Sequence, residues 1–240
     1  MSTSPEIAGN EPPAPTGPRL ASGWGPGDAL LGLLYAFGAF LIGGILIYPI
    51  TGTDGLDAQL GGQAMLEIAL VSVAFGFARA KSPLPPWEAL GLRAPKRGWI
   101  GVAAAGYAIY FVFVIAVVEI LGSPEQTDVA DQLGFDQSVF AAIAAAALIV
   151  FIVPFCEELF FRGFFYGGMR RRLPFALAAP ISAVLFGAVH LGEANLIAGL
   201  QLAFLGLVLA TVYERTGSLW SNIAIHAVNN ALAFTLLVST

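Results

Sequence analysis

Long apolar stretches separated by short polar segments dominate the chain from about residue 29 onward. A helix that crosses a membrane needs about 20 mostly apolar residues. The pattern predicts an all-α polytopic transmembrane helix bundle with about seven spans: Ala29–Ile50, Gly62–Ala80, Gly98–Leu121, Ser138–Met169, Pro174–Leu191, Ala194–Tyr213 and Ser218–Val238. The fourth stretch is longer than a bilayer requires. We expect it to extend beyond the membrane or to kink at Pro154.

The composition of the chain also indicates a membrane protein. The 240 residues are 57% hydrophobic and only 11% charged, whereas soluble domains are about 25% charged. We expect one membrane domain at residues 28–240, after a disordered cytoplasmic tail at residues 1–27 that is rich in Pro, Gly and Ser. The chain has no basic surface typical of nucleic-acid binding, so membrane lipids and a peptide or membrane-protein substrate are the expected partners. A single cysteine, Cys156, excludes an internal disulfide.

The distribution of charge predicts the orientation of the bundle. If the seven helices alternate in direction, the loops on the N-terminal side contain all of the Lys and Arg residues except Arg162. The charged residues in the loops on the opposite side are all acidic. By the positive-inside rule, the N-terminus is cytoplasmic and the C-terminus is outside. The Ala- and Gly-rich composition suggests a bacterial cell membrane.

Three charged side chains lie inside the fourth apolar stretch: Glu157, Glu158 and Arg162. A charged side chain at membrane depth is energetically unfavourable, so it indicates a functional role unless the group is paired or hydrated. Glu158 and Arg162 are four residues apart on one helix face, in the order that favours an ion pair. Glu157 lies about 100° further round the helix and has no such partner. Glu158 and Arg162 are therefore predicted to brace the helix, and Glu157 is the candidate for chemistry.

The two histidines of the chain are predicted to reach the depth of Glu157. At about 1.5 Å of rise per residue, Glu157 lies about 20 Å from the basic end of the bundle, and His190 lies about 24 Å from it. His226 and Asn230 lie about 12 Å and about 18 Å in, and they share one face of the seventh helix. Phe186 is four residues before His190, so its ring can pack beside the imidazole.

A glutamate, two histidines and an asparagine can together hydrolyse an amide. A desolvated carboxylate can take a proton from water and return it to the leaving amine. One histidine can share this water, while the other histidine and the carboxamide can donate hydrogen bonds to the developing oxyanion. The sequence contains neither G-x-S-x-G nor H-E-x-x-H, which argues against a serine hydrolase and a zincin.

Three motifs in this region resemble those of the CPBP family, which includes the type 2 CAAX prenyl proteases and the Abi-type intramembrane proteases. The motifs are E-E-x-x-x-R at 157–162, F-x-x-x-H at 186–190 and H-x-x-x-N at 226–230, within a core at 138–238. The resemblance implies an intramembrane endopeptidase that cleaves a membrane-associated or CAAX-like peptide. It implies that Glu157 and His190 activate the water and that His226 and Asn230 bind the oxyanion.

Two questions stay open at this point. The reaction could need no metal, or Glu157, His190 and His226 could bind a divalent ion such as zinc, since two His and one Glu form a known catalytic set. The same polar residues could also serve a proton-coupled transporter, or be retained in a non-catalytic scaffold or immunity protein of the same fold.

The remaining polar residues at membrane depth are predicted to be structural. Glu67 and Glu119 fall near the outer ends of their helices, where a side chain can reach the interface. Asn222 is assigned to the start of the seventh helix or to its interface. Cys156 is interpreted as a small buried hydrophobe, because its side chain points about 100° away from Glu157.

Overall fold

The computed structural model describes residues 23–51, 56–123, 139–191 and 196–238, and helices are the regular secondary structure found within them. In chain order they are α1 Pro26–Thr51, α2 Leu56–Lys81, α3 Pro86–Ala89, α4 Trp99–Leu121, α6 Val139–Ala147, η1 Leu148–Ile152, α7 Val153–Glu158, η2 Leu159–Tyr166, α8 Gly167–Arg170, α9 Phe175–Val189, α10 Leu196–Thr216 and α11 Leu219–Val238. The predicted all-α class is confirmed.

Each of the seven predicted stretches contains helix within the residues that the structure describes. Five helices are long and apolar enough to cross a membrane, and they lie at Pro26–Pro49, Leu60–Lys81, Trp99–Leu121, Ile143–Arg170 and Leu196–Thr216. The other two are α9, which has 15 residues, and α11, which has 20 residues and whose polar side chains include Asn222, His226, Asn229 and Asn230. The chain is therefore a multi-pass membrane protein.

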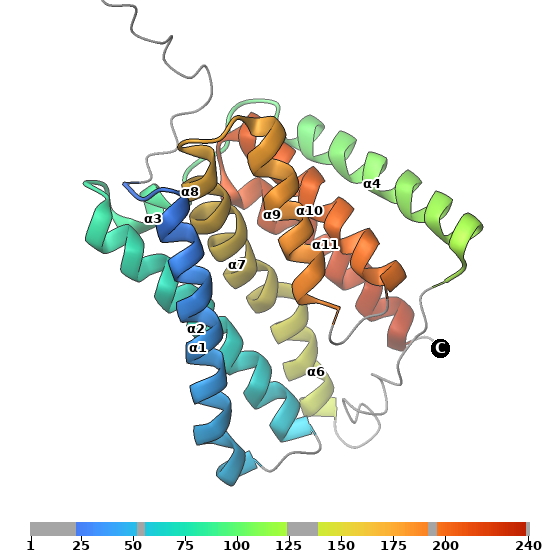
Figure 1. Cartoon of the computed structure of the whole chain (residues 1–240). Helices are drawn as coiled ribbons and strands as arrows, with labels where there is room; N and C mark the ends of the chain where they lie inside the picture. Colours follow the sequence, from blue (N-terminus) through green and yellow to red (C-terminus); the bar gives the residue numbers. More distant parts are fainter. Residues whose placement is uncertain (1–22, 52–55, 124–138, 192–195, 239–240) are drawn as a thin grey trace, which may run out of the picture.

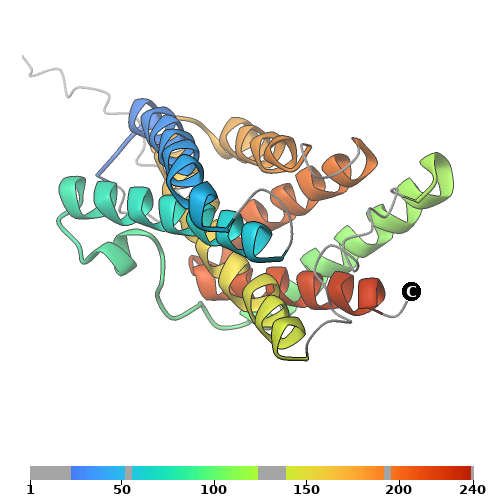
Figure 2. The same cartoon turned by 90° about the horizontal axis from the view of Figure 1, so that it is seen from below.

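Residues 139–170 form one continuous helical rod through the middle of the bundle. Helices α1 and α2 lie on one side of the rod, and α9, α10 and α11 lie on the other (Figures 1 and 2). Most side chains from residue 156 to residue 169 are fully buried. The rod thus contacts both halves, and its polar residues are enclosed by the other helices.

The rod passes Pro154 by changing its helical pitch. Proline has no N–H and cannot pair with the carbonyl four residues earlier. The π-helical segment η1 immediately precedes it, and there the Val153 N–H bonds to the Leu148 carbonyl, five residues back. A second π-helical segment, η2, begins directly after Glu158. Wide turns of this kind often occur at functional sites, and here they lie on either side of Glu157.

The basic loops meet at one end of the bundle, as the alternating charge pattern requires. Lys81 pairs with Asp28 at 2.5 Å, and Arg170 pairs with Glu214 at 2.7 Å. The Arg93 Nε donates to the Gly217 carbonyl at 2.7 Å. That this end faces the cytoplasm remains a prediction.

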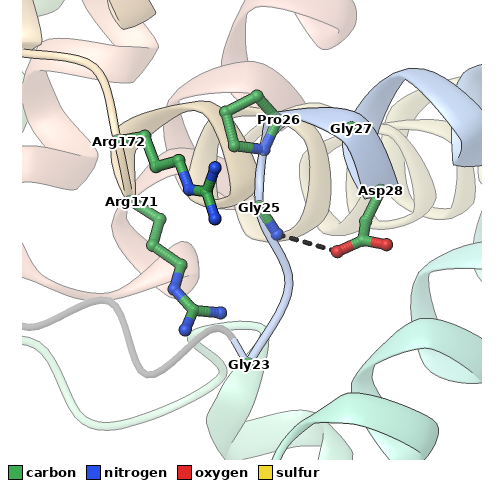
Figure 3. A pocket seen from close by; sticks show the side chains of 7 residues that line it. All are labelled: Gly23, Gly25, Pro26, Gly27, Asp28, Arg171 and Arg172. Atoms are coloured by element: carbon green, nitrogen blue, oxygen red, sulfur yellow. Dashed lines mark hydrogen bonds between the residues drawn. The ribbon is translucent and has the colours of Figure 1, made fainter.

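The start of α1 is packed against this basic end. Trp24 is fully buried, and its indole N–H donates to the Phe164 carbonyl at 2.8 Å. The packed chain thus includes residues 23–27 of the segment expected to be a tail, whereas residues 1–22 lie outside the described residues. Arg171 and Arg172 lie beside the backbone of Gly25 around a surface pocket of about 410 Å³ (Figure 3). The lining of this pocket includes none of the candidate catalytic residues.

The loop after α3 holds the beginning of α11. The Leu219 N–H donates to the Gly91 carbonyl at 2.9 Å, and the Tyr213 hydroxyl donates to the Leu90 carbonyl at 3.3 Å. Gly91 has a φ of +96°, and a Cβ at this position would meet the Tyr213 ring. Glycine is therefore needed at position 91, where the loop contacts α11, the helix that carries His226.

This packing yields a matched pair of variants. Gly91→Ala and Gly98→Ala both place a side chain at positive φ, which costs about 1–2 kcal/mol of backbone strain. A Cβ at Gly98 would meet no atom within 4 Å, so only Gly91→Ala adds a clash, which typically costs about 1–3 kcal/mol more. Thermal unfolding in detergent should give a lower midpoint for Gly91→Ala than for Gly98→Ala. Equal midpoints would contradict the close approach.

Candidate active site

The centre of the site is the carboxylate of Glu157, in the middle of the rod. This side chain is 5% exposed. Its Oε1 lies 3.6 Å from His190 Nε2, and its Oε2 lies 3.6 Å from His226 Nε2. Three helical elements, α7, the C-terminal end of α9 and α11, therefore bring one group each to a common point. The depth argument made from the sequence anticipates this convergence.

His190 is oriented by its own helix. Its Nδ1 lies 2.6 Å from the Phe186 carbonyl oxygen, which can only accept a hydrogen bond, so Nδ1 carries the proton. In the neutral ring, Nε2 is then the hydrogen-bond acceptor, and this atom faces Glu157. Their separation of 3.6 Å is longer than a direct hydrogen bond. The geometry suits two groups that act on a third between them.

His226 lies between two carboxylates. Its Nδ1 is 3.1 Å from Glu158 Oε1, while its Nε2 faces Glu157. The imidazole is 2% exposed. Each ring nitrogen of His226 therefore faces one carboxylate, and the ring joins Glu157 to Glu158.

Glu158 connects three elements of the bundle. It is fully buried, and its Oε1 accepts from Arg162 Nη1 at 2.8 Å, which forms the ion pair expected from the i,i+4 spacing. Its Oε2 accepts from Asn222 Nδ2 at 3.2 Å. Together with His226, these contacts join the rod to α11. The bracing contact predicted for Glu158 and Arg162 is present in the structure.

Phe186 links the two histidines and the arginine. Its ring centroid lies 4.9 Å from that of His190 and 5.7 Å from that of His226. The Arg162 guanidinium lies 4.3 Å from the same ring, within cation–π distance. The supporting position expected for Phe186 beside His190 is therefore seen, with two further contacts that the spacing did not predict.

Asn230 lies one turn beyond His226 but bonds elsewhere. Its Nδ2 donates to the Ile149 carbonyl at 3.0 Å, within the π-helical segment η1. Among the hydrogen bonds of the described residues, its partner is thus the rod backbone rather than Glu157. A carboxamide has two N–H donors, so this contact leaves a second donor for another acceptor.

Asn222 lies near the start of α11 and at its interface with other helices, as predicted from the sequence. Asn222 is fully buried and donates both to Glu158 and to the Leu209 carbonyl, at 2.8 Å for the latter. Its spacing of four residues from His226 was a signal of this shared face. Glu67 was expected to reach the interface, but it is 3% exposed and interacts with Cys156 and with the charge of Glu157. Glu119, by contrast, is exposed.

The residues that the structure describes contain no preformed set of metal ligands. No group of three His, Cys, Asp or Glu side chains in them is arranged to hold an ion. That Glu157, His190 and His226 could bind a divalent ion stays a prediction.

The fold and this cluster define a multi-pass membrane protein with a buried carboxylate–imidazole centre. Residues 139–232 match the family model described as type II CAAX prenyl endopeptidase Rce1-like. A curated protein of Bacillus subtilis (strain 168), described as "Putative membrane peptidase YdiL", is 32% identical over 98 residues, which cover 39% of this chain and 39% of that protein. No solved structure matches. The matched segment contains all three motifs, so the resemblance to the CAAX protease family is confirmed there.

The buried ion pair can be tested by stability. Removing one partner of such a pair costs about 3–5 kcal/mol, because it leaves a buried charge unpaired. Arg162→Met should therefore lower the free energy of unfolding by this amount, and Glu158→Gln combined with Arg162→Met should recover part of the loss. Lys81→Met breaks an exposed pair, whose side chains are 44% and 24% exposed, and should cost less than about 1 kcal/mol. Equal losses for Arg162→Met and Lys81→Met, measured in detergent, would contradict the assignment.

Proposed function

We propose that this protein is an intramembrane endopeptidase that hydrolyses a peptide bond in a membrane-associated or CAAX-like peptide, using a water activated by Glu157 and His190. The observation that supports this most is the pair of contacts at Glu157. Each oxygen of one buried carboxylate faces the Nε2 of a different histidine at 3.6 Å. The match of residues 139–232 to the prenyl endopeptidase family supports the same conclusion.

In the first step, Glu157 and His190 bind one water between them. The carboxylate takes a proton from this water, and the oxygen attacks the carbonyl carbon of the scissile peptide bond. His190 Nε2 accepts the second hydrogen of the water in a hydrogen bond, which orients the oxygen. The Phe186 carbonyl holds the other ring nitrogen, so the imidazole cannot turn away.

The tetrahedral intermediate places a negative charge on the former carbonyl oxygen. His226 donates to this oxyanion from Nε2, and Glu158 holds the ring in place through its contact with Nδ1. The free N–H of Asn230 supplies a second donor. When the C–N bond breaks, Glu157 returns its proton to the leaving amine, and the carboxylate is restored.

Burial makes these few groups effective. In a site that excludes bulk water, fixed donors stabilise developing charge more strongly than they would in solution. The Glu158–Arg162 pair and the Phe186 ring keep the groups in place before the substrate arrives. No step in this scheme requires a metal.

The central test is Glu157→Gln in purified protein. Peptides with and without a prenyl group are screened in detergent, and cleavage is followed by mass spectrometry. Loss of the general base should lower kcat by about 10²–10⁴-fold, whereas Glu119→Gln, which makes the same change at an exposed site on α4, should leave the rate unchanged. Cleavage by Glu157→Gln at the wild-type rate would contradict the proposal.

The same preparation tests the metal-free scheme. A chelator should not lower the rate, and elemental analysis should show less than one equivalent of bound zinc. Stoichiometric zinc together with loss of activity on chelation would overturn that part of the proposal. Proton flux in liposomes without peptide cleavage would favour the transporter alternative.

A further inference from the structure

Glu67 is a buried acid that the proposed reaction does not use. It lies on α2, outside the segment that matches the protease family, and is 3% exposed. The Gln63 amide donates to its Oε1 at 2.5 Å. Its Oε2 is buried and has no partner within ordinary hydrogen-bond geometry among the described residues. A carboxyl group in this position is unfavourable compared with an apolar side chain of similar size, so a purely structural role does not explain it.

The surroundings of Glu67 place it beside the catalytic stretch. Helix α2 packs against α7 and η2, and the groups that face the Glu67 carboxyl group across this contact are the Cys156 thiol and the charge of Glu157. The salt bridges of the described residues pair their arginines and lysines with other acids, not with Glu67. Its polar neighbours are therefore Gln63 on its own helix and the two residues at the centre of α7.

We propose that Glu67 is a positioning residue of the Glu157 site: from α2 it contacts Cys156, holds this turn of α7 in place, and so fixes the Glu157 carboxylate between His190 and His226. This inference rests on the proposed function. Cys156 directly precedes Glu157, so a shift of its backbone moves the carboxylate as well. Helix α2 thereby helps to position the active site.

Glu67 performs this role as a neutral group. Two carboxylates in one dry region repel each other when both are ionised, and Glu157 must be ionised to act as the base. A glutamine at position 67 has nearly the same shape and no charge, so it should replace the glutamate. A leucine keeps the volume but removes the polar contacts.

The kinetic test compares three variants on the peptide that wild type cleaves. Glu67→Leu should lower kcat at least tenfold with KM within twofold of wild type, because the base is displaced while the substrate still binds. Glu67→Gln should retain at least half of the wild-type kcat. Glu119→Leu, at an exposed glutamate, should match wild type. A wild-type kcat for Glu67→Leu, or an equal loss for Glu67→Gln, would overturn the proposal.

A second test does not depend on peptide cleavage. Cys156 is the only cysteine of the chain and is buried, so alkylation by N-ethylmaleimide reports on this contact alone. Glu67→Ala removes the side chain that interacts with the thiol and should raise the alkylation rate at least fivefold in folded protein, whereas Glu119→Ala should not. An unchanged rate would refute the contact between Glu67 and Cys156.

The two tests separate the two possible failures. If wild type cleaves no peptide but Glu67→Ala exposes the thiol, the proposed function fails and the contact stands. If wild type is active and the Glu67 variants behave like it, only the present inference fails. If Glu67→Ala is not monodisperse with a cooperative melt, Gln63→Leu takes its place, because it removes only the donor to Oε1. It should change both readouts in the same direction by a smaller factor, and no change in either would overturn the proposal.

Discussion

The carboxylate of Glu158 is the interaction on which the arrangement of this site depends. It is fully buried and accepts from Arg162, His226 and Asn222. Each of these contacts is charged or polar in an otherwise apolar interior, where an unpaired group would be strongly unfavourable. The helical rod and α11 can therefore meet in few alternative ways. The orientation of His226 toward Glu157 follows from this constraint, as does the position of Arg162 against the Phe186 ring.

The adjacent acids Glu157 and Glu158 have different roles, and this difference explains how a membrane interior can contain a reactive carboxylate. Glu158 has three donors and is committed to structure. Glu157 faces two imidazole nitrogens at a distance too long for direct hydrogen bonds, so its oxygens are free to act on a water. The π-helical turns on either side of α7 lie where the rod must accommodate Pro154 and present both acids to α11.

Local spacing and helical rise were sufficient to predict much of this site. The Glu158–Arg162 and Phe186–His190 contacts each lie within one helix, and the depth of Glu157, His190 and His226 depends only on residue count. The burial of Glu67 and the contact of Asn222 with Glu158 were missed because they depend on how one helix is rotated against another. Asn230 was predicted on the correct helix face, but its partner, the Ile149 carbonyl, is presented by a π-helical turn that no simple periodicity reveals.

The account's central claim is that Glu157 and His190 act on one shared water. The most direct measurement is a double-mutant cycle on kcat/KM with Glu157→Gln, His190→Ala and the combined variant. Groups that act as a unit have non-additive effects. The account predicts that the combined variant is within about threefold of the slower single variant. Losses that multiply, as for two independent groups, would contradict it.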